Sequence, residues 1–191
     1  MSKDTVIAQL RDVFRQYGYE GTSLTKISEA TGLGRASLYH YFPKGKEEMA
    51  ATVLDRVYID LEEHLLKALR GNGKPIDRIR AMGQTLNQFY NGGQASCFLD
   101  LLSIGEAYPL FQTPIYQTLT AWVEALASVL MEAGQDPKVA HDRAEDAIAQ
   151  IEGSLVLSRC FGNTDSFQRA IARLPEILGL LPIGDKSGFS T

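Results

Sequence analysis

The chain has 191 residues, of which 45% are hydrophobic and 22% are charged, a balance typical of a globular protein with a buried core. No apolar run approaches the roughly 18 residues of a membrane span, and the N-terminal sequence MSKDTVIAQL lacks the apolar centre of a signal peptide, so a cytoplasmic protein is expected. The net charge of −4 is uneven, because residues 1–50 carry seven Lys and Arg against six Asp and Glu, while the acidic excess lies in residues 51–191. A nucleic-acid-binding protein of this composition would depend on specific side-chain contacts rather than on a net positive charge.

The two cysteines, Cys97 and Cys160, lie far apart and have no second Cys or His at metal-binding spacing. We interpret them as reduced core thiols, with a redox or ligand-adduct role as the alternative. No metal site and no cofactor are expected.

The first two predicted elements are short helices. Apolar residues at helical spacing predict a helix over 3–17 that stops at Gly18. Ser23 suits the N-cap of a second helix, 24–31, which Gly32 ends. The apolar side chains expected to face inward from these two helices are Val6, Leu10, Val13, Phe14, Tyr17, Leu24, Ile27 and Ala30.

A third short helix is predicted over 35–42, with Leu38 and Phe42 on its inner face. Pro43 and Gly45 break the chain before a long fourth helix from Lys46 to about Arg70. The sequence GNGKP at 71–75 is the clearest boundary signal. Further helices are expected over 76–91, 98–107, 114–133, 138–161 and 165–181, with breaks at 91–93, Pro109, 134–137 and 162–165. No strand-like alternation stands out, so the predicted fold is all-α.

The stretch from Ser23 to Phe42 has the organisation of a helix-turn-helix. Gly32 permits the positive φ of a sharp turn, and the apolar anchors Leu33 and Leu38 let the first helix brace the second. The remaining face of the second helix carries groups that donate, accept or stack, and one small residue that allows close approach to base edges. These are Arg35, Ala36, Ser37, Tyr39, His40 and Tyr41. Lys46, at the next helix N-terminus, suits a phosphate. Each has an alternative: Arg35 and Lys46 as solvated surface cations, Tyr39 as a core aromatic.

An ordered string of residues over about 5–55 resembles the TetR family of bacterial transcriptional regulators. It consists of Gly18, Gly21, Thr22, Ser23, Ile27, Gly32, Leu38, Tyr39, Phe42 and then Lys46-Glu47-Glu48-Met49. The form FPKGKEEMA and the segment GGQASCFLDLLSIGEA at 92–107 resemble the LmrA- and YxaF-like branch. Gly34 departs from the family, which often has a Ser N-cap there, and Ala36 stands where Gly is common.

The resemblance implies an Ω-shaped homodimer that acts as a ligand-released repressor on a palindromic operator. It divides the chain into a helix-turn-helix domain, 1–48, and a ligand-binding and dimerisation domain, 49–183. The Gly- and Ser-rich composition at the C-terminus predicts a flexible tail, 184–191. Thr25 and Lys46 would touch phosphates, and Tyr39 and Tyr41 the DNA backbone. The residues nearest the bases would be Arg35, Ala36, Ser37 and His40.

Aromatic and soft side chains concentrate in the body between residues 86 and 123. They indicate an apolar cavity with polar handles at Asn87, Gln88, Glu106 and Gln112, or simply the core of the bundle. The candidate ligand-binding residues are Phe89, Cys97, Phe98, Tyr108, Phe111, Tyr116 and Trp122. In the resembling branch, planar apolar effectors such as flavonoids are known, which makes a small hydrophobic, aromatic effector the expectation.

The helices at 138–161 and 165–181 are the candidate dimer face. Small and apolar residues recur there at three- and four-residue steps, a pattern that suits close packing against a two-fold partner or against the chain's own bundle. These residues are Ala144, Ala147, Ile148, Ile151, Leu155 and Ser158.

Two other classes of function compete with a DNA-binding regulator. An enzyme is disfavoured, because the sequence has no nucleophile–His–acid pattern, no phosphate loop and no metal-spaced His pair. His141 and Glu145 are neighbours on one helix but lack further ligands. An adaptor that kept the fold and lost DNA reading has the near-neutral charge of residues 1–50 as its support.

Overall fold

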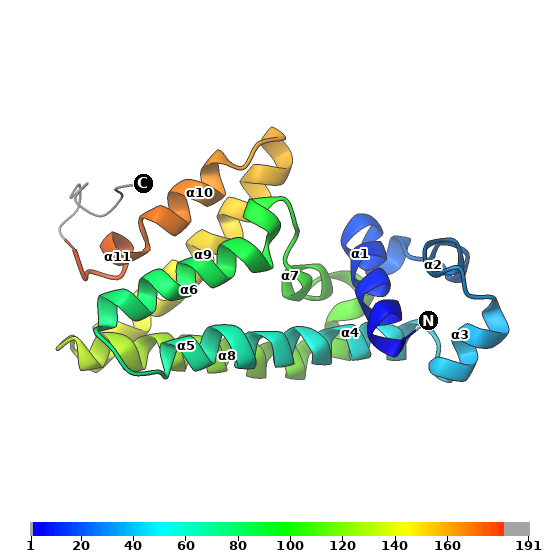
Figure 1. Ribbon diagram of the computed structural model, residues 1–191, viewed down its shortest axis with the longest axis horizontal. Coiled ribbons are helices and arrows are strands. Elements are labelled where there is room, and N and C mark those ends of the chain that lie inside the picture. Colours follow the sequence, from blue (N-terminus) through cyan, green and yellow to red (C-terminus); the bar gives the residue numbers. More distant parts are fainter. Residues whose placement is uncertain (1, 182–191) are drawn as a thin grey trace. The chain divides into compact units, whose positions relative to one another are not determined.

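The computed structural model describes residues 2–181, and every regular element in that range is helical (Figure 1). The all-α prediction is confirmed. The tail expected at 184–191 lies outside the described residues. The chain divides into two compact units, Met1–Asp60 with Cys97–Thr118, and Leu61–Ser96 with Leu119–Thr191. We call these the reader unit and the bundle unit, and describe each over its described residues.

The reader unit is formed by two chain segments. The first contributes four helices, and the second contributes two short elements and the beginning of a long helix. The first segment forms α1 (Lys3–Gly21), α2 (Leu24–Thr31), α3 (Arg35–Tyr41) and α4 (Lys46–Asp60). The second forms α7 (Phe98–Leu102), the 3₁₀ turn η3 (Gly105–Ala107) and the first turns of α8 (Tyr108–Glu132).

The core of the reader unit is shared between its two chain segments. From α1, Val6, Leu10, Val13 and Phe14 are buried as predicted. The Phe98 ring meets the Phe14 ring edge-on at 6.1 Å between centroids. The second segment therefore completes the hydrophobic core over α1.

The end of α1 differs from its prediction in one side chain. Gly18 interrupts the helical backbone with φ 70°, as its predicted stop requires, and one further turn continues to Gly21. Tyr17, expected inside, is 40% exposed. The Lys26 ammonium lies 3.9 Å from the centre of the Tyr17 ring, so a cation covers this aromatic face.

The bundle unit is built from the remaining helices. These are the single π-helical turn η1 (Leu61–Leu66), α5 (Lys67–Leu69), α6 (Pro75–Phe89), η2 (Asn91–Gly93), the rest of α8, α9 (Pro137–Phe161), α10 (Asp165–Ala172) and α11 (Leu174–Ile177). α9 packs on α10 and α11, and α6 packs on the same two helices. Arg78 of α6 is buried; it donates to the carbonyls of Leu69 and Gly71 at 3.0 and 3.2 Å and pairs with Glu132.

A close backbone approach fixes the connection after α6. Gly93 has φ 97°, and a Cβ there would lie 2.8 Å from three atoms of Phe167, which is fully buried on α10. The Phe167 ring also meets the Tyr90 ring edge-on at 5.9 Å. Glycine at position 93 thus lets the backbone lie directly on the Phe167 side chain.

Two predicted helix bounds around α7 and α8 were wrong for physical reasons. The helix expected over 98–107 splits into α7 and η3, because the backbone is extended at Ile104 (φ −130°, ψ 166°) and Gly105 follows it with φ 60°. α8 starts at Tyr108 rather than at residue 114, since Pro109 in the first turn needs no N–H donor. Pro114 lies inside that helix, and the Thr118 hydroxyl donates to its carbonyl at 2.7 Å.

The long helix expected over 46–70 changes to a π-helical turn after Asp60, and the helix expected over 165–181 ends at Ala172 before α11 begins. Pro175 lacks the N–H that a continuous helix would use at that point. The boundary expected between residues 48 and 49 does not coincide with the boundaries of the compact units, because residues 97–118 share a core with α1. The functional division at that boundary stays a prediction.

Candidate nucleic-acid interface

The helix-turn-helix is held by short side-chain bonds. Ser23 caps α2 by accepting from the Lys26 N–H at 3.3 Å, as predicted. Gly32 follows α2 with φ 67°. The Ser28 hydroxyl donates to the Leu33 carbonyl at 2.5 Å, so the turn between α2 and α3 is fixed from within the motif.

The inner face of α3 is fully enclosed. Leu38 and Phe42 are 0% and 1% exposed, and Ile27 of α2 is 0% exposed. Ala30, expected to face inward beside Ile27, is exposed. Burial of Leu38 and Phe42 sets the rotation of α3 about its axis, and this decides which side chains face solvent.

The outer face of α3 gathers most of the predicted DNA-contacting residues. Arg35, Ala36, Ser37 and His40 are exposed, as is Thr25 on α2. Gly34 caps α3 without a side-chain bond. A polar, exposed face on a short helix with a buried back is the geometry that major-groove reading requires.

The aromatic residues of α3 are divided between surface and support. Tyr39 is 46% exposed, and its ring lies 3.5 Å from where a Cβ on Gly45 would stand, so it also covers the turn into α4. Tyr41 is half-buried, with its ring centroid 5.9 Å from that of His40. The core alternative for Tyr39 therefore fits in part, and its contact with DNA stays a prediction.

Lys46 has an internal partner that the sequence did not reveal. Its ammonium donates to the Tyr19 carbonyl at 3.1 Å and lies 4.3 Å from the centre of the Tyr19 ring. Burial raises the pKa of Tyr19, and the nearby Glu47, Glu106 and Glu20 raise it further. Lys46 thus joins the first residue of α4 to the end of α1, and a phosphate contact from the same ammonium stays a prediction. The partner lies 27 residues away, beyond any local pattern.

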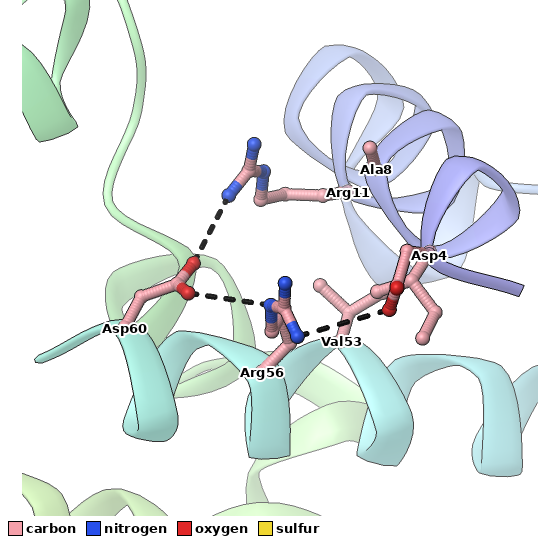
Figure 2. Close-up of a pocket in the computed structure, with 7 residues that line it drawn as sticks. Asp4, Ala8, Arg11, Val53, Arg56 and Asp60 are labelled. Atoms are coloured by element: carbon pink, nitrogen blue, oxygen red, sulfur yellow. Dashed lines mark ion pairs between the residues drawn. The ribbon is translucent and has the colours of Figure 1, made fainter. Parts of the chain in front are cut away.

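Ion pairs fasten α1 to α4 around a small cavity of about 130 Å³ (Figure 2). The Asp60 carboxylate forms ion pairs with the Arg11 guanidinium at 3.6 Å and the Arg56 guanidinium at 3.3 Å. Arg56 also pairs with the Asp4 carboxylate at 3.7 Å. Two carboxylates offset two guanidinium groups, so the cavity is no anion site. The arrangement braces the C-terminal end of α4, where the chain leaves the reader unit.

The predicted ligand-binding residues are spread over both units. In the reader unit Cys97, Phe98 and Phe111 are buried, while Tyr108 and Tyr116 are 42% and 69% exposed. Phe111 packs edge-on against Tyr19 at 5.7 Å and Phe98 against Phe14, so these two rings serve the core. The remaining two, Phe89 and Trp122, belong to the bundle unit, where Phe89 is half-buried. None of the seven lines the α1–α4 cavity or the two open grooves of the bundle unit.

Trp122 carries an unsatisfied donor. The side chain is 1% exposed, and its indole Nε1 has no hydrogen-bond partner among the described residues. An unpaired buried donor costs about 1–3 kcal/mol. An acceptor that reached the indole Nε1 would remove this cost.

The predicted dimer-interface residues face the interior of their own unit. Ala144, Ala147, Ile148, Ile151, Leu155 and Ser158 are all at most 7% exposed within the single chain. The stripe is buried within the bundle unit, where α9 packs on α10 and α11. Their burial within one chain fits the alternative of an internal bundle face, and a role for them in the dimer interface stays a prediction.

The remaining expectations concern the cysteines, His141, metal sites and membrane-spanning helices. Neither cysteine forms a disulfide within the described residues, and Cys97 is buried as expected whereas Cys160 is exposed. The His141 Nδ1–H donates to the Pro137 carbonyl at 2.8 Å, and Nε2 lies 3.2 Å from the Glu124 carboxylate rather than pairing with Glu145. Within residues 2–181 no cluster of three metal-ligating side chains exists, and no helix there is long and apolar enough to cross a membrane.

Comparison with known proteins agrees with the geometry of α2 and α3. Residues 6–53 match the family of bacterial regulatory proteins of the tetR type, and residues 94–173 match the C-terminal domain of LmrA/YxaF-like transcriptional regulators. The chain belongs to the TetR family. It is a DNA-binding transcriptional regulator with a TetR N-terminal domain and an LmrA/YxaF-like C-terminal domain.

Relatives span nearly the whole chain. The HTH-type transcriptional regulator LmrA of Bacillus subtilis (strain 168) is 23% identical over 187 residues, 93% of this chain and 96% of LmrA. The uncharacterized HTH-type regulator YxaF of the same organism is 27% identical over 162 residues, 82% and 84% of the two chains. A TetR regulator from Legionella pneumophila has the same fold, with a TM-score of 0.78, 20% identity and coverage of 92% and 96%.

Proposed function

We propose that this TetR-family regulator is a homodimeric repressor that binds a palindromic operator through α3 and leaves it when a small hydrophobic effector binds. The observation that carries the proposal is the exposed polar face of α3 over its buried Leu38 and Phe42. As a regulator of bacterial type it would act in the cytoplasm, where the DNA lies.

DNA reading is tested with a duplex selected from a random library by the wild-type protein. Fluorescence anisotropy compares that duplex with a scrambled one at two salt concentrations. Arg35→Ala should reduce the preference for the selected duplex, because a base-reading arginine is worth about 1–3 kcal/mol of discrimination. Arg80→Ala, which removes a half-exposed arginine from α6, serves as the control.

A protein-interaction adaptor would give a different result in the same experiment. It would enrich no duplex and show no salt-dependent affinity, whereas a reader loses affinity steeply as salt rises. Equal affinity for selected and scrambled duplexes in the wild-type protein would refute sequence-specific reading.

The dimer surface is better assigned to the outer side of α9 and α10. An open groove of about 560 Å³ lies there, lined by Gly153, Val156 and Leu157 of α9 together with α10 residues. Val156, Leu157 and Phe161 are 38%, 45% and 65% exposed. Adjacent exposed apolar side chains of this kind mark association sites, and a second copy would cover them by two-fold symmetry.

Dimerisation is tested by light scattering on a sizing column at micromolar concentration. Leu157→Glu should shift the mass from dimer to monomer, since a carboxylate would be buried at the contact. Val139→Glu places the same charge at an exposed apolar position in the first turn of α9, outside the groove, and should leave a dimer. A monomeric wild-type protein would refute the assignment.

Effector binding is proposed at Trp122, whose buried indole N–H lacks a partner among the described residues. The chain has a single tryptophan, so its fluorescence reports directly on this position. A panel of flavonoids should include compounds that quench Trp122 emission, raise the melting temperature and release the selected duplex. If no compound does so, a planar apolar effector is wrong.

A further inference from the structure

The end of α1 and the turn before α8 are joined by one carboxylate. Glu20, in the last turn of α1, accepts a hydrogen bond from the Glu106 N–H at 2.7 Å, across 86 positions of sequence. Both residues belong to the reader unit. Glu106 lies in η3, and this turn comes from the second chain segment, so the bond links the two segments of the unit.

The backbone at Gly105 is shaped around this carboxylate. Gly105 has φ 60°, and a Cβ at this position would overlap the Glu20 Oε1 atom. Any larger residue would displace the carboxylate or strain the turn. Glycine therefore permits the close approach that the Glu20 bond needs.

Glu20 is ionised, and so an acceptor, at neutral pH. Hydrogen bonding to backbone N–H groups, first its own and then those of Glu106 and Ala107, outweighs desolvation and lowers the pKa of this carboxyl. The bond at Glu106 is thus charge-assisted, which makes it stronger than a neutral one.

The neighbour of Glu20 continues the connection to the reading helix. The Tyr19 ring contacts Phe111 of α8, and the Tyr19 carbonyl accepts from Lys46. Lys46 is the first residue of α4 and follows the turn at Gly45 over which Tyr39 of α3 lies. Direct contacts therefore run from η3 through the end of α1 to the turn between α3 and α4.

We propose that Glu20 is a positioning residue that couples the turn at Gly105–Ala107 to the DNA-reading helix. With the bond made, the end of α1 holds Lys46 and the start of α4 in place, so less ordering is needed when DNA binds. The turn lies between Phe98 and Tyr108, within the stretch of residues 86–123 where the sequence predicts effector-binding residues. This role rests on the proposed function, and movement of that segment would act on the reader by breaking the Glu20 bond.

The test uses the full-length protein and the selected duplex. Glu20→Ala removes the acceptor, and we expect the dissociation constant to rise about 5-fold, at the lower end of allosteric coupling. Glu20→Gln keeps an acceptor oxygen while removing the charge, and it should stay within about 2-fold of wild type. Asp12→Ala removes an exposed carboxylate from the same helix and should have no effect.

A second measurement distinguishes coupling to DNA binding from a purely structural role of the Glu20–Glu106 hydrogen bond. Coupling is reciprocal, so DNA binding must strengthen the bond that favours it. Hydrogen exchange of the Glu106 amide should therefore slow when the duplex is added to wild type, and show no such change in Glu20→Ala. Gly105→Ala should behave as Glu20→Ala, because its Cβ takes the place of the carboxylate. Melting temperatures establish that each variant is folded.

The outcomes distinguish the two proposals. If wild type selects and binds a duplex but Glu20→Ala binds it equally, with the Glu106 amide unchanged by DNA, the coupling role is refuted while the regulator stands. Equal weakening by Glu20→Ala and Glu20→Gln, with the Glu106 amide of wild type unchanged by DNA, would show that charge rather than the bond matters, and would also refute the coupling role. If wild type selects no duplex, the proposed function and the coupling role both fail.

Discussion

Substitution of Gly93 by alanine should cost this protein a substantial part of its stability. The residue has φ 97°, and an added Cβ would lie 2.8 Å from Phe167 Cβ, Cγ and Cδ1. The backbone conformation costs an L-residue about 1–2 kcal/mol, and forcing a methyl group into a packed contact costs about 1–3 kcal/mol. Together these give about 2–5 kcal/mol, because Phe167 is fully buried and cannot swing into solvent.

The assay is thermal unfolding followed by circular dichroism at one fixed protein concentration. For a chain of this size each kcal/mol lowers the melting temperature by roughly 2–4 °C, so a fall of about 4–20 °C is expected. Gly134→Ala is the matched control, since Gly134 has φ 89° and no atom within 4 Å of an added Cβ. It should show the backbone cost alone. Equal melting temperatures for the two variants would refute the claim that contact with Phe167 constrains position 93.

Three further predictions concern the core, the surface and DNA binding. Phe98→Ala should lower the free energy of unfolding by about 3–5 kcal/mol, measured by urea denaturation, because the ring fills the core against Phe14; a loss below about 1 kcal/mol would instead suit a ligand-facing side chain. The pKa of His141 should lie above 6.5 by NMR titration, since the Pro137 carbonyl and then Glu124 favour the protonated ring. The stabilisation of the fold by protonated His141 is present below pH 6.5 and is lost as the pH rises through the raised pKa. Glu124→Gln should lower the pKa of His141 without restoring 6.5. A wild-type His141 pKa of 6.5 would contradict the contacts with Pro137 and Glu124. Arg35→Ala should change the logarithmic salt slope of DNA binding by less than about 1 if Arg35 reads bases, whereas loss of a phosphate contact would reduce the slope by about 1.

Local signals predicted the helix-turn-helix accurately. α2 runs over Leu24–Thr31 as expected, because Ser23 and Gly32 act on the backbone within one turn of the residues they bound. Burial of Leu38 and Phe42 followed from helical spacing, and with it the exposed face of α3. These interactions lie within the local sequence.

Long-range choices were harder to predict. The stripe from Ala144 to Ser158 has the spacing of a contact face, but spacing does not tell whether the same chain or a second copy covers it. The partners of Lys46 and Glu20 are distant in sequence, and so neither contact has a local signature. Pro109 was read as a break, although proline in a first helical turn is compatible with the helix.

The shared core of the reader unit has a consequence for synthesis on the ribosome and for protein engineering. Phe14 and Tyr19 are covered by Phe98 and Phe111, which are translated much later. During elongation the apolar side of α1 that carries Phe14 and Tyr19 stays uncovered until residues 97–118 emerge from the exit tunnel. A chimaera that joins only the first 48 residues to the C-terminal domain of another protein would leave the same apolar surface uncovered. Its folding would depend on whether that domain supplies aromatic rings where Phe98 and Phe111 contact α1.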